Sequence, residues 1–174
     1  YIEYTFGGTI FLVEWFDHPF EPFEQVEVGN SWEASFVVDC DAEDQAIGPT
    51  VGRYLLESAS ISLPGIELLT DSGHIRVDVL DDEITFGAEG MPHNGNMVAR
   101  FFGPGLVQDD LLPSEALLES FPSVSFGFGA GTAEGPAIHF EGTVESIDVS
   151  VIPTAPSLSV AVLVMLAARR RRLP

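Results

Sequence analysis

The sequence of 174 residues contains no lysine, a single cysteine and only seven arginines, four of which stand together near its end. Residues 1–168 carry three arginines against all 27 acidic residues, so their net charge is −24. Such a surface repels nucleic acid phosphates and anionic lipids, which argues against both as partners of the body. The acids are scattered, a pattern that mainly raises solubility; divalent-cation binding and a salty, polyanionic surrounding are the alternatives.

Because Cys40 is the only cysteine, an internal disulfide is excluded and the fold must hold without one. Cys40 stands between Asp39 and Asp41, whose negative charges make a poor setting for a nucleophilic thiolate.

Catalytic motifs are also lacking. The four histidines show neither His-x-His nor His-Glu-x-x-His spacing, and no Gly-x-Ser-x-Gly sequence occurs. The glycine-rich stretch 127–131 follows a strand pattern and leads to no helix, which argues against a phosphate loop. We therefore expect a protein that is not an enzyme. Glycoside hydrolysis is an alternative, since it needs only two carboxylates at the right separation.

Turn residues are abundant, with 17 glycines and 12 prolines, and they separate short segments of alternating pattern. In 31–39 the apolar residues Trp32, Ala34, Phe36 and Val38 share one parity, which predicts a strand with one face on a core. Further strands are expected over 5–16, 52–63, 67–69, 74–80, 83–86, 97–102, 123–128 and 137–151, with a bend at Gly7-Gly8 and loops at 87–95 and 129–135.

Eight to ten such strands predict an all-β fold for residues 1–150, an antiparallel β-sandwich of jelly-roll-like type. The thirteen phenylalanines, Trp15 and Trp32 are expected mostly in its core rather than on a ligand-stacking surface. One short helix competes over 111–121, where Ser114 is a candidate N-cap.

The densest acidic loop is 39–44. Its carboxylates are oxygen ligands of the kind that Ca²⁺ prefers, at Asp39, Asp41, Glu43 and Asp44. The loop is not an EF-hand, because the sixth position is not glycine and the twelfth is not glutamate. Acids in such loops, as in the second cluster at 78–83, also serve as turn formers. The sequence implies no cofactor other than this candidate calcium ion.

Residues 151–174 form a second unit, a sorting or anchoring tail with a proline-containing stalk, an apolar segment and an arginine cluster. The apolar run 158–168 is about half of the roughly 20 residues that a spanning helix needs, so we expect a short hydrophobic helix there. Its membrane residues are Leu158, Val160, Val162, Leu163, Val164 and Leu166. The arginines that follow would stay cytoplasmic and leave the acidic body outside. This is the logic of a signal whose hydrophobic tail is recognised and removed.

This tail resembles the PEP-CTERM sorting signal of Gram-negative and related environmental bacteria, in which a short proline-containing motif precedes a hydrophobic segment and a terminal arginine cluster. Pro153-Thr154-Ala155-Pro156 stands where the family has Pro-Glu-Pro. The residues that carry the match, apart from the apolar run, are Val151, Pro153, Thr154, Pro156, Arg169, Arg170, Arg171 and Arg172. The body segments 4–10, 29–36 and 50–54 look like the opening of all-β domains often attached to such tails.

The resemblance implies an exosortase-like processing enzyme as partner and transient insertion of the tail into the inner membrane. We therefore expect an exported bacterial protein of the cell surface or extracellular matrix, with a structural or adhesive role and extracellular polysaccharide as a candidate partner. Export requires a signal upstream of Tyr1. A carbohydrate-binding module is the first alternative function and a glycan hydrolase the second.

Overall fold

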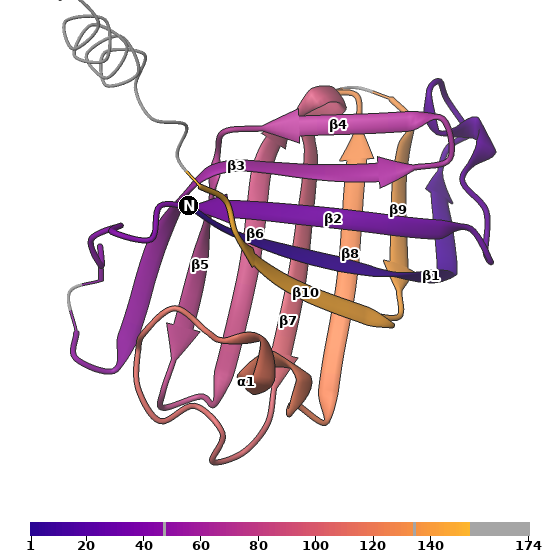
Figure 1. Ribbon diagram of the computed structural model, residues 1–174. Coiled ribbons are helices and arrows are strands. Elements are labelled where there is room, and N and C mark those ends of the chain that lie inside the picture. The colour runs from indigo at the N-terminus through magenta and orange to yellow at the C-terminus, as the bar shows by residue number, and fades with distance from the viewer. Residues whose placement is uncertain (47, 134, 154–174) are drawn as a thin grey trace, which may run out of the picture.

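A computed structural model describes residues 1–46, 48–133 and 135–153, which form one ten-stranded antiparallel sheet (Figure 1). The strands are β1 (Ile2–Phe16), β2 (Ser31–Val38), β3 (Val51–Leu63), β4 (Ile66–Thr70), β5 (Gly73–Asp78), β6 (Glu83–Met91), β7 (Gly95–Phe102), β8 (Ser123–Gly131), β9 (Ala137–Gly142) and β10 (Ser146–Val151). Three short helical segments accompany them: η1 (Phe23–Gln25), η2 (Pro92–Asn94) and α1 (Glu115–Glu119).

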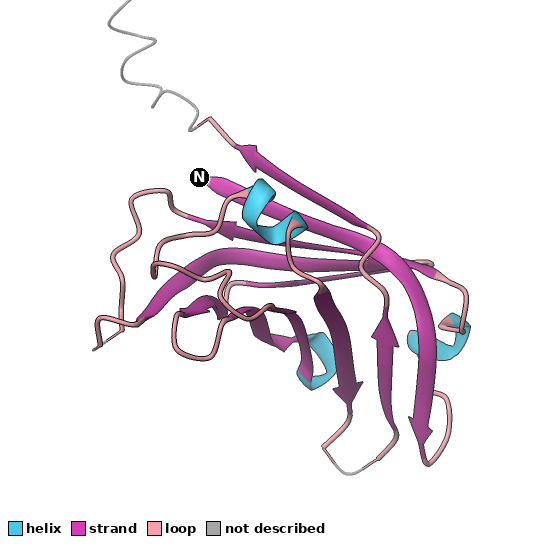
Figure 2. Ribbon diagram, turned by 90° about the horizontal axis from the view of Figure 1, so that it is seen from below, coloured by secondary structure: helices cyan, strands magenta, loops and turns pink. Residues whose placement is uncertain are grey.

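Eight strands close into a barrel in the order β1-β2-β3-β5-β6-β7-β8-β9, with β9 returning to β1. The barrel closes because two long strands, β1 and β3, each pair with strands of both layers. The first half of β1 pairs with β2 and β10, and its second half pairs with β9. Likewise, β3 pairs first with β5 and then with β2 and β4. In Figure 1 the layer β10-β1-β2-β3-β4 therefore crosses the layer of β5 to β9, and Figure 2 shows β1 curving from one into the other.

The bend of β1 lies where the sequence predicts it, next to Gly7-Gly8. A Cβ on Gly8 would collide with the carbonyl oxygen of Thr143, which lies in the connection between β9 and β10. The strand changes partners directly after this point, and its register shifts between Ile10 and Leu12. Close approach of two backbone segments thus requires glycine at the corner of the barrel.

Aromatic rings fill the interior. The ring centroid of Phe6 lies 4.9 Å from that of Phe86, 5.3 Å from that of Phe101 and 5.8 Å from that of Phe36, and all four side chains are fully buried. Burial of each such ring contributes about 1.5–3 kcal/mol to folding. The predicted aromatic core is confirmed.

The two tryptophans also pack inward. Trp32 is 3% exposed and stacks on Phe126 with ring centroids 3.7 Å apart. Trp15 is partly buried and meets Phe20 edge to face. The expected packing role is therefore confirmed for Trp32, and Trp15 packs against the same core at its margin.

The all-β antiparallel prediction is confirmed, whereas a jelly-roll-like sandwich is not, because the sheet closes and successive strands are mostly neighbours. Both expected loops are shorter than predicted, because β6 continues to Met91 and β8 reaches Gly131. Gly87 and Gly129 keep strand pairing, whereas Gly90 has a φ of 72° where the register of β6 shifts. The single strand expected over 137–151 is divided into β9 and β10. A Cβ on Gly142 would collide with the Trp32 indole at that division.

The connection from β7 to α1 is tied to the barrel by two tyrosines. Tyr4 Oη donates to the carbonyl oxygen of Pro113 at 3.0 Å, and Tyr54 Oη donates to that of Asp110 at 2.8 Å. The predicted helix is confirmed as α1, and Ser114 Oγ accepts the N–H of Leu117 at 3.3 Å as its N-cap.

The folded body extends just beyond β10, because the N–H of Ile152 donates to the carbonyl oxygen of Tyr1 at 2.9 Å. Val151 is the last residue of β10 and Pro153 is exposed. The rest of the expected tail lies outside the described residues, including Thr154, Pro156, the predicted helix at 158–168 and Arg169 to Arg172. Within the described residues, no helix has the length and apolar character needed to cross a membrane.

Candidate functional site

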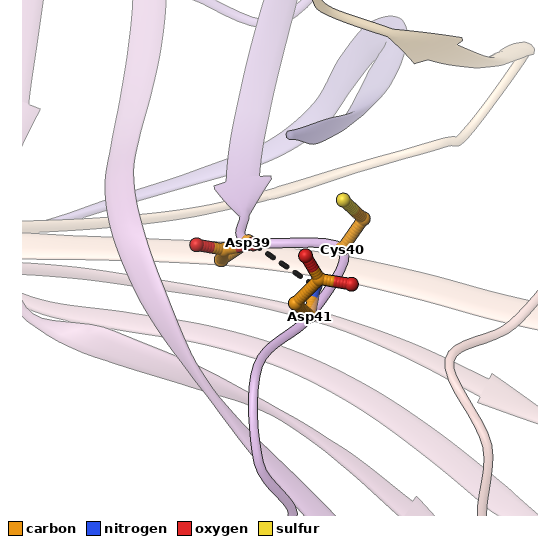
Figure 3. Close-up of side chains that lie close together, drawn as sticks. All are labelled: Asp39, Cys40 and Asp41. Carbon is orange, nitrogen blue, oxygen red and sulfur yellow. Dashed lines mark hydrogen bonds between the residues drawn. The ribbon is translucent and has the colours of Figure 1, made fainter. Parts of the chain in front are cut away.

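The acidic loop after β2 brings Asp39, Cys40 and Asp41 together, with one potential ligand atom of each within 4.8 Å of the others (Figure 3). The Asp39 carboxylate accepts the N–H of Asp41 at 2.9 Å, which is turn chemistry. Cys40 is free and exposed, and its thiol points away from the Asp39 carboxylate in Figure 3.

The other two predicted calcium ligands do not join this group. Glu43 is exposed, and Asp44 Oδ1 accepts the N–H of Ala46 and that of Arg53, each at 2.8 Å. Asp44 thereby fastens the loop to the start of β3. The second acidic cluster, at 78–83, also stabilises a turn, because Asp78 Oδ1 accepts the N–H of Leu80 at 3.0 Å. The structure gives these acids a local structural role and does not gather the four predicted ligands.

A second surface holds the scarce positive charge of the body. Arg53 on β3 lies opposite Arg76 on β5, which lies opposite Thr85 on β6, which lies opposite Arg100 on β7. We call these four residues the arginine row. With strands about 4.8 Å apart, the row spans about 14 Å across the outer face of the barrel. All three arginines are exposed.

The three guanidinium groups differ in their partners. Arg76 pairs with Asp78, and Arg100 Nε lies 3.9 Å from Glu83 Oε1. Within the described part of the chain, no carboxylate lies within 4.0 Å of the guanidinium of Arg53. Arg53 therefore keeps its five donors for water or a ligand.

Beside the arginine row runs a line of opposed residues that includes two glycines, which we call the glycine row: His74, Gly87, Val98, Gly127 and Glu141 on β5 to β9. Neither glycine has a positive φ. A Cβ added to Gly87 would meet no atom closer than 3.9 Å, and one added to Gly127 none closer than 3.8 Å. The fold therefore does not require glycine at either position. Glycine inside a strand weakens it and often marks close approach of a ligand.

Two hollows meet at the β5 end of the glycine row. One, of about 280 Å³, lies over β5 to β7 and is lined by residues that include His74, Gly87, Glu89, Asn96 and Val98. The other, of about 270 Å³, lies over β3 and β5 and is lined by residues that include Arg53, Leu55, Asp71, His74 and Glu89. His74 and Glu89 line both hollows, which are therefore neighbours. Together the two linings offer one cation (Arg53), two carboxylates (Asp71 and Glu89), an amide, an imidazole and two aliphatic side chains.

Burial lowers the pKa of His74 from its ordinary value of 6.5, and the nearby positive charge of Arg53 lowers it further. Glu89 acts in the opposite direction, and Arg76 adds to the lowering. His74 is therefore a neutral imidazole at pH 7. In that form it can donate one hydrogen bond and accept another.

Sequence reasoning missed this surface for a physical reason. Gly87 falls in a stretch that reads as a loop, so the strand that places it beside His74 was not expected in full. The alternation of Arg76 with Ile75 and Val77 does predict that Arg76 points outward. Its position opposite Arg53 depends on the pairing of β3 with β5, which no local pattern reveals.

Comparison with protein-family models, with curated proteins and with solved structures finds no match to this chain.

Proposed function

We propose that this chain is an exported protein of the cell surface or extracellular matrix, with a structural or adhesive role carried out by binding at its outer face. The proposal that binding takes place on the outer face depends on the aromatic interior. Phe6, Phe36, Phe86 and Phe101 occupy the space inside the barrel that an internal ligand would need. A ligand must then be held outside the barrel, where the arginine row and the glycine row lie.

The sequence beyond Pro153 supports export. The variant motif Pro153-Thr154-Ala155-Pro156, the apolar run and Arg169 to Arg172 together suit an exosortase-like enzyme that removes the tail at the inner membrane. Removal would also take away four of the seven arginines. The released body would then carry its positive charge only at Arg53, Arg76 and Arg100.

A carbohydrate-binding role is the form of this function that the surface favours. Open hollows lined by His74, Glu89 and Asn96 offer both hydrogen-bond donors and acceptors, which suits a ligand rich in hydroxyl groups. Leu55 and Val98 add apolar contact area for the C–H faces of a sugar ring.

Mass spectrometry of the protein from fractions of its native host tests the sorting part. We expect the body in the envelope or medium, with a C-terminus that ends before Arg169. A variant with Arg169 to Arg172 replaced by serine should remain unprocessed, and a matched variant with Arg53, Arg76 and Arg100 replaced should be processed normally. A cytoplasmic protein that retains all four terminal arginines would overturn the proposal.

A further inference from the structure

Resting on the proposed binding role, we propose that the glycine row and its two hollows form a site for an acidic polysaccharide, with a sugar carboxylate held by Arg53. The site uses no side chain of the acidic loop 39–44, although Asp44 of that loop accepts the N–H of Arg53. Its evidence is the combination of open glycines, two neighbouring hollows and the one guanidinium for which the described chain offers no carboxylate within 4.0 Å.

The floor of the site suits a chain-like ligand. Gly87 and Gly127 lie two strands apart on the outer face, with Val98 between them. From β5 to β9 the glycine row covers about 19 Å at ordinary strand spacing, which is longer than one sugar ring. Both positions have room for a side chain, so packing within the protein does not explain the two glycines. Close approach of an external ligand to the backbone does explain them.

Arg53 selects the charge of the ligand. A guanidinium fork matches a carboxylate with two parallel hydrogen bonds, and such bonds are stronger than neutral ones. Arg76 and Arg100 already face Asp78 and Glu83, so the face does not suit a densely charged polymer such as a nucleic acid. A sugar chain with at most one carboxylate per ring fits a surface with a single available cation.

The remaining polar groups fit sugar hydroxyls. Glu89 accepts hydrogen bonds, Asn96 and neutral His74 both donate and accept, and all three line the same hollow as Gly87. The scattered acids of the body repel an anionic chain at long range, but at physiological salt charges more than about 8 Å away are largely screened. At the site itself, Asp71 and Glu89 line the same hollow as Arg53, and Glu141 ends the glycine row. The sugar carboxylate must therefore reach Arg53 while sugar hydroxyl groups face these three acids.

Isothermal titration of the full chain with oligomers of galacturonate, glucuronate and mannuronate tests the proposal, with fully methyl-esterified galacturonate as a neutral control of the same backbone. We expect at least one acidic oligomer to bind and its esterified form to bind at least tenfold more weakly. Arg53→Gln should weaken binding at least tenfold, and Arg53→Lys should weaken it less.

The glycines give a test that separates binding from folding. Gly87→Val and Gly127→Val should abolish binding while the melting temperature stays unchanged or rises, because a β-branched residue suits a strand and each Cβ has room. Ser60→Val on β3, which lies in the crossing layer between Ser35 and Leu69, should bind normally. Equal affinity for acid and ester, or no binding of any acidic oligomer by the folded protein, would overturn the site. Neither result would affect sorting of the tail, so the two proposals fail separately.

Discussion

Arg53 of β3 lies directly opposite Arg76 of β5, in a body that carries only three arginines. Like charges directly opposite one another destabilise a sheet. Asp78 faces Arg76, but within the described residues no carboxylate lies within 4.0 Å of the Arg53 guanidinium. Of the three arginines of the body, Arg53 is therefore the one at which an anion would gain most.

Arg53→Gln should therefore be more stable than Arg100→Gln. Both substitutions change the net charge equally, but only the first relieves a like-charge pair, since Arg100 lies opposite Thr85 and Ser125. We expect a difference of about 0.2–1 kcal/mol in the free energy of unfolding, measured by urea denaturation. A less stable Arg53→Gln variant would show that Arg53 has a stabilising partner.

Gly87→Ala should stabilise the fold by about 0.5–1 kcal/mol, because glycine weakens a strand and the added Cβ has room. Gly73→Ala is the matched control on the neighbouring strand. Its Cβ would lie 2.8 Å from Leu56 Cδ1 and 2.9 Å from Ala88 Cα, so we expect it to be destabilising. Thermal unfolding of both variants tests whether their melting temperatures change in opposite directions. A lower melting temperature of Gly87→Ala would show that the surface at Gly87 has no room for a side chain.

His74 should make stability depend on pH in mildly acidic solution. Its pKa in the folded chain lies below the ordinary value of 6.5, so below pH 6.5 the unfolded chain binds a proton that the folded chain does not. The stability that His74 contributes is therefore complete above pH 6.5 and declines as the pH falls toward its folded pKa. The free energy of unfolding, measured by urea denaturation between pH 7 and 5, should therefore depend less on pH in His74→Gln than in the wild-type protein. An equal pH dependence in both proteins would contradict a lowered pKa of His74.

Asp44→Ala should destabilise the protein by about 0.5–1.5 kcal/mol, because its exposed carboxylate accepts the N–H groups of Ala46 and Arg53. Asp44→Asn keeps an acceptor oxygen and should cost less. We expect neither added calcium nor a chelator to change the melting temperature of the wild-type protein. A clear rise with calcium would instead support the metal site predicted at Asp39, Asp41, Glu43 and Asp44.

The sequence predicts the local features of this fold well. Alternation of Trp32, Ala34, Phe36 and Val38 identifies β2, and Ser114 correctly marks the start of α1. It does not predict closure, since the pairing of β9 with β1 joins residues more than a hundred positions apart and depends on the whole barrel.

The candidate site is harder to predict for the same reason. A glycine such as Gly87 raises the turn propensity of its segment, yet the neighbouring strands hold it in extended conformation. The arginine row exists only through cross-strand register, in which residues at 53, 76 and 100 become neighbours. The acidic loop shows the reverse case, because its acids are conspicuous in the sequence and serve the turn.

Chemical-shift mapping of the backbone amides tests the central claim most directly. The ¹⁵N-labelled protein is titrated with the acidic oligomer that binds most tightly by calorimetry. We expect the largest shifts at Gly87, Val98 and Gly127, with little change at Ser35 and Ser60 of the crossing layer. Shifts that gather on the crossing layer, or around the loop at Asp39, would contradict a binding site on the glycine row.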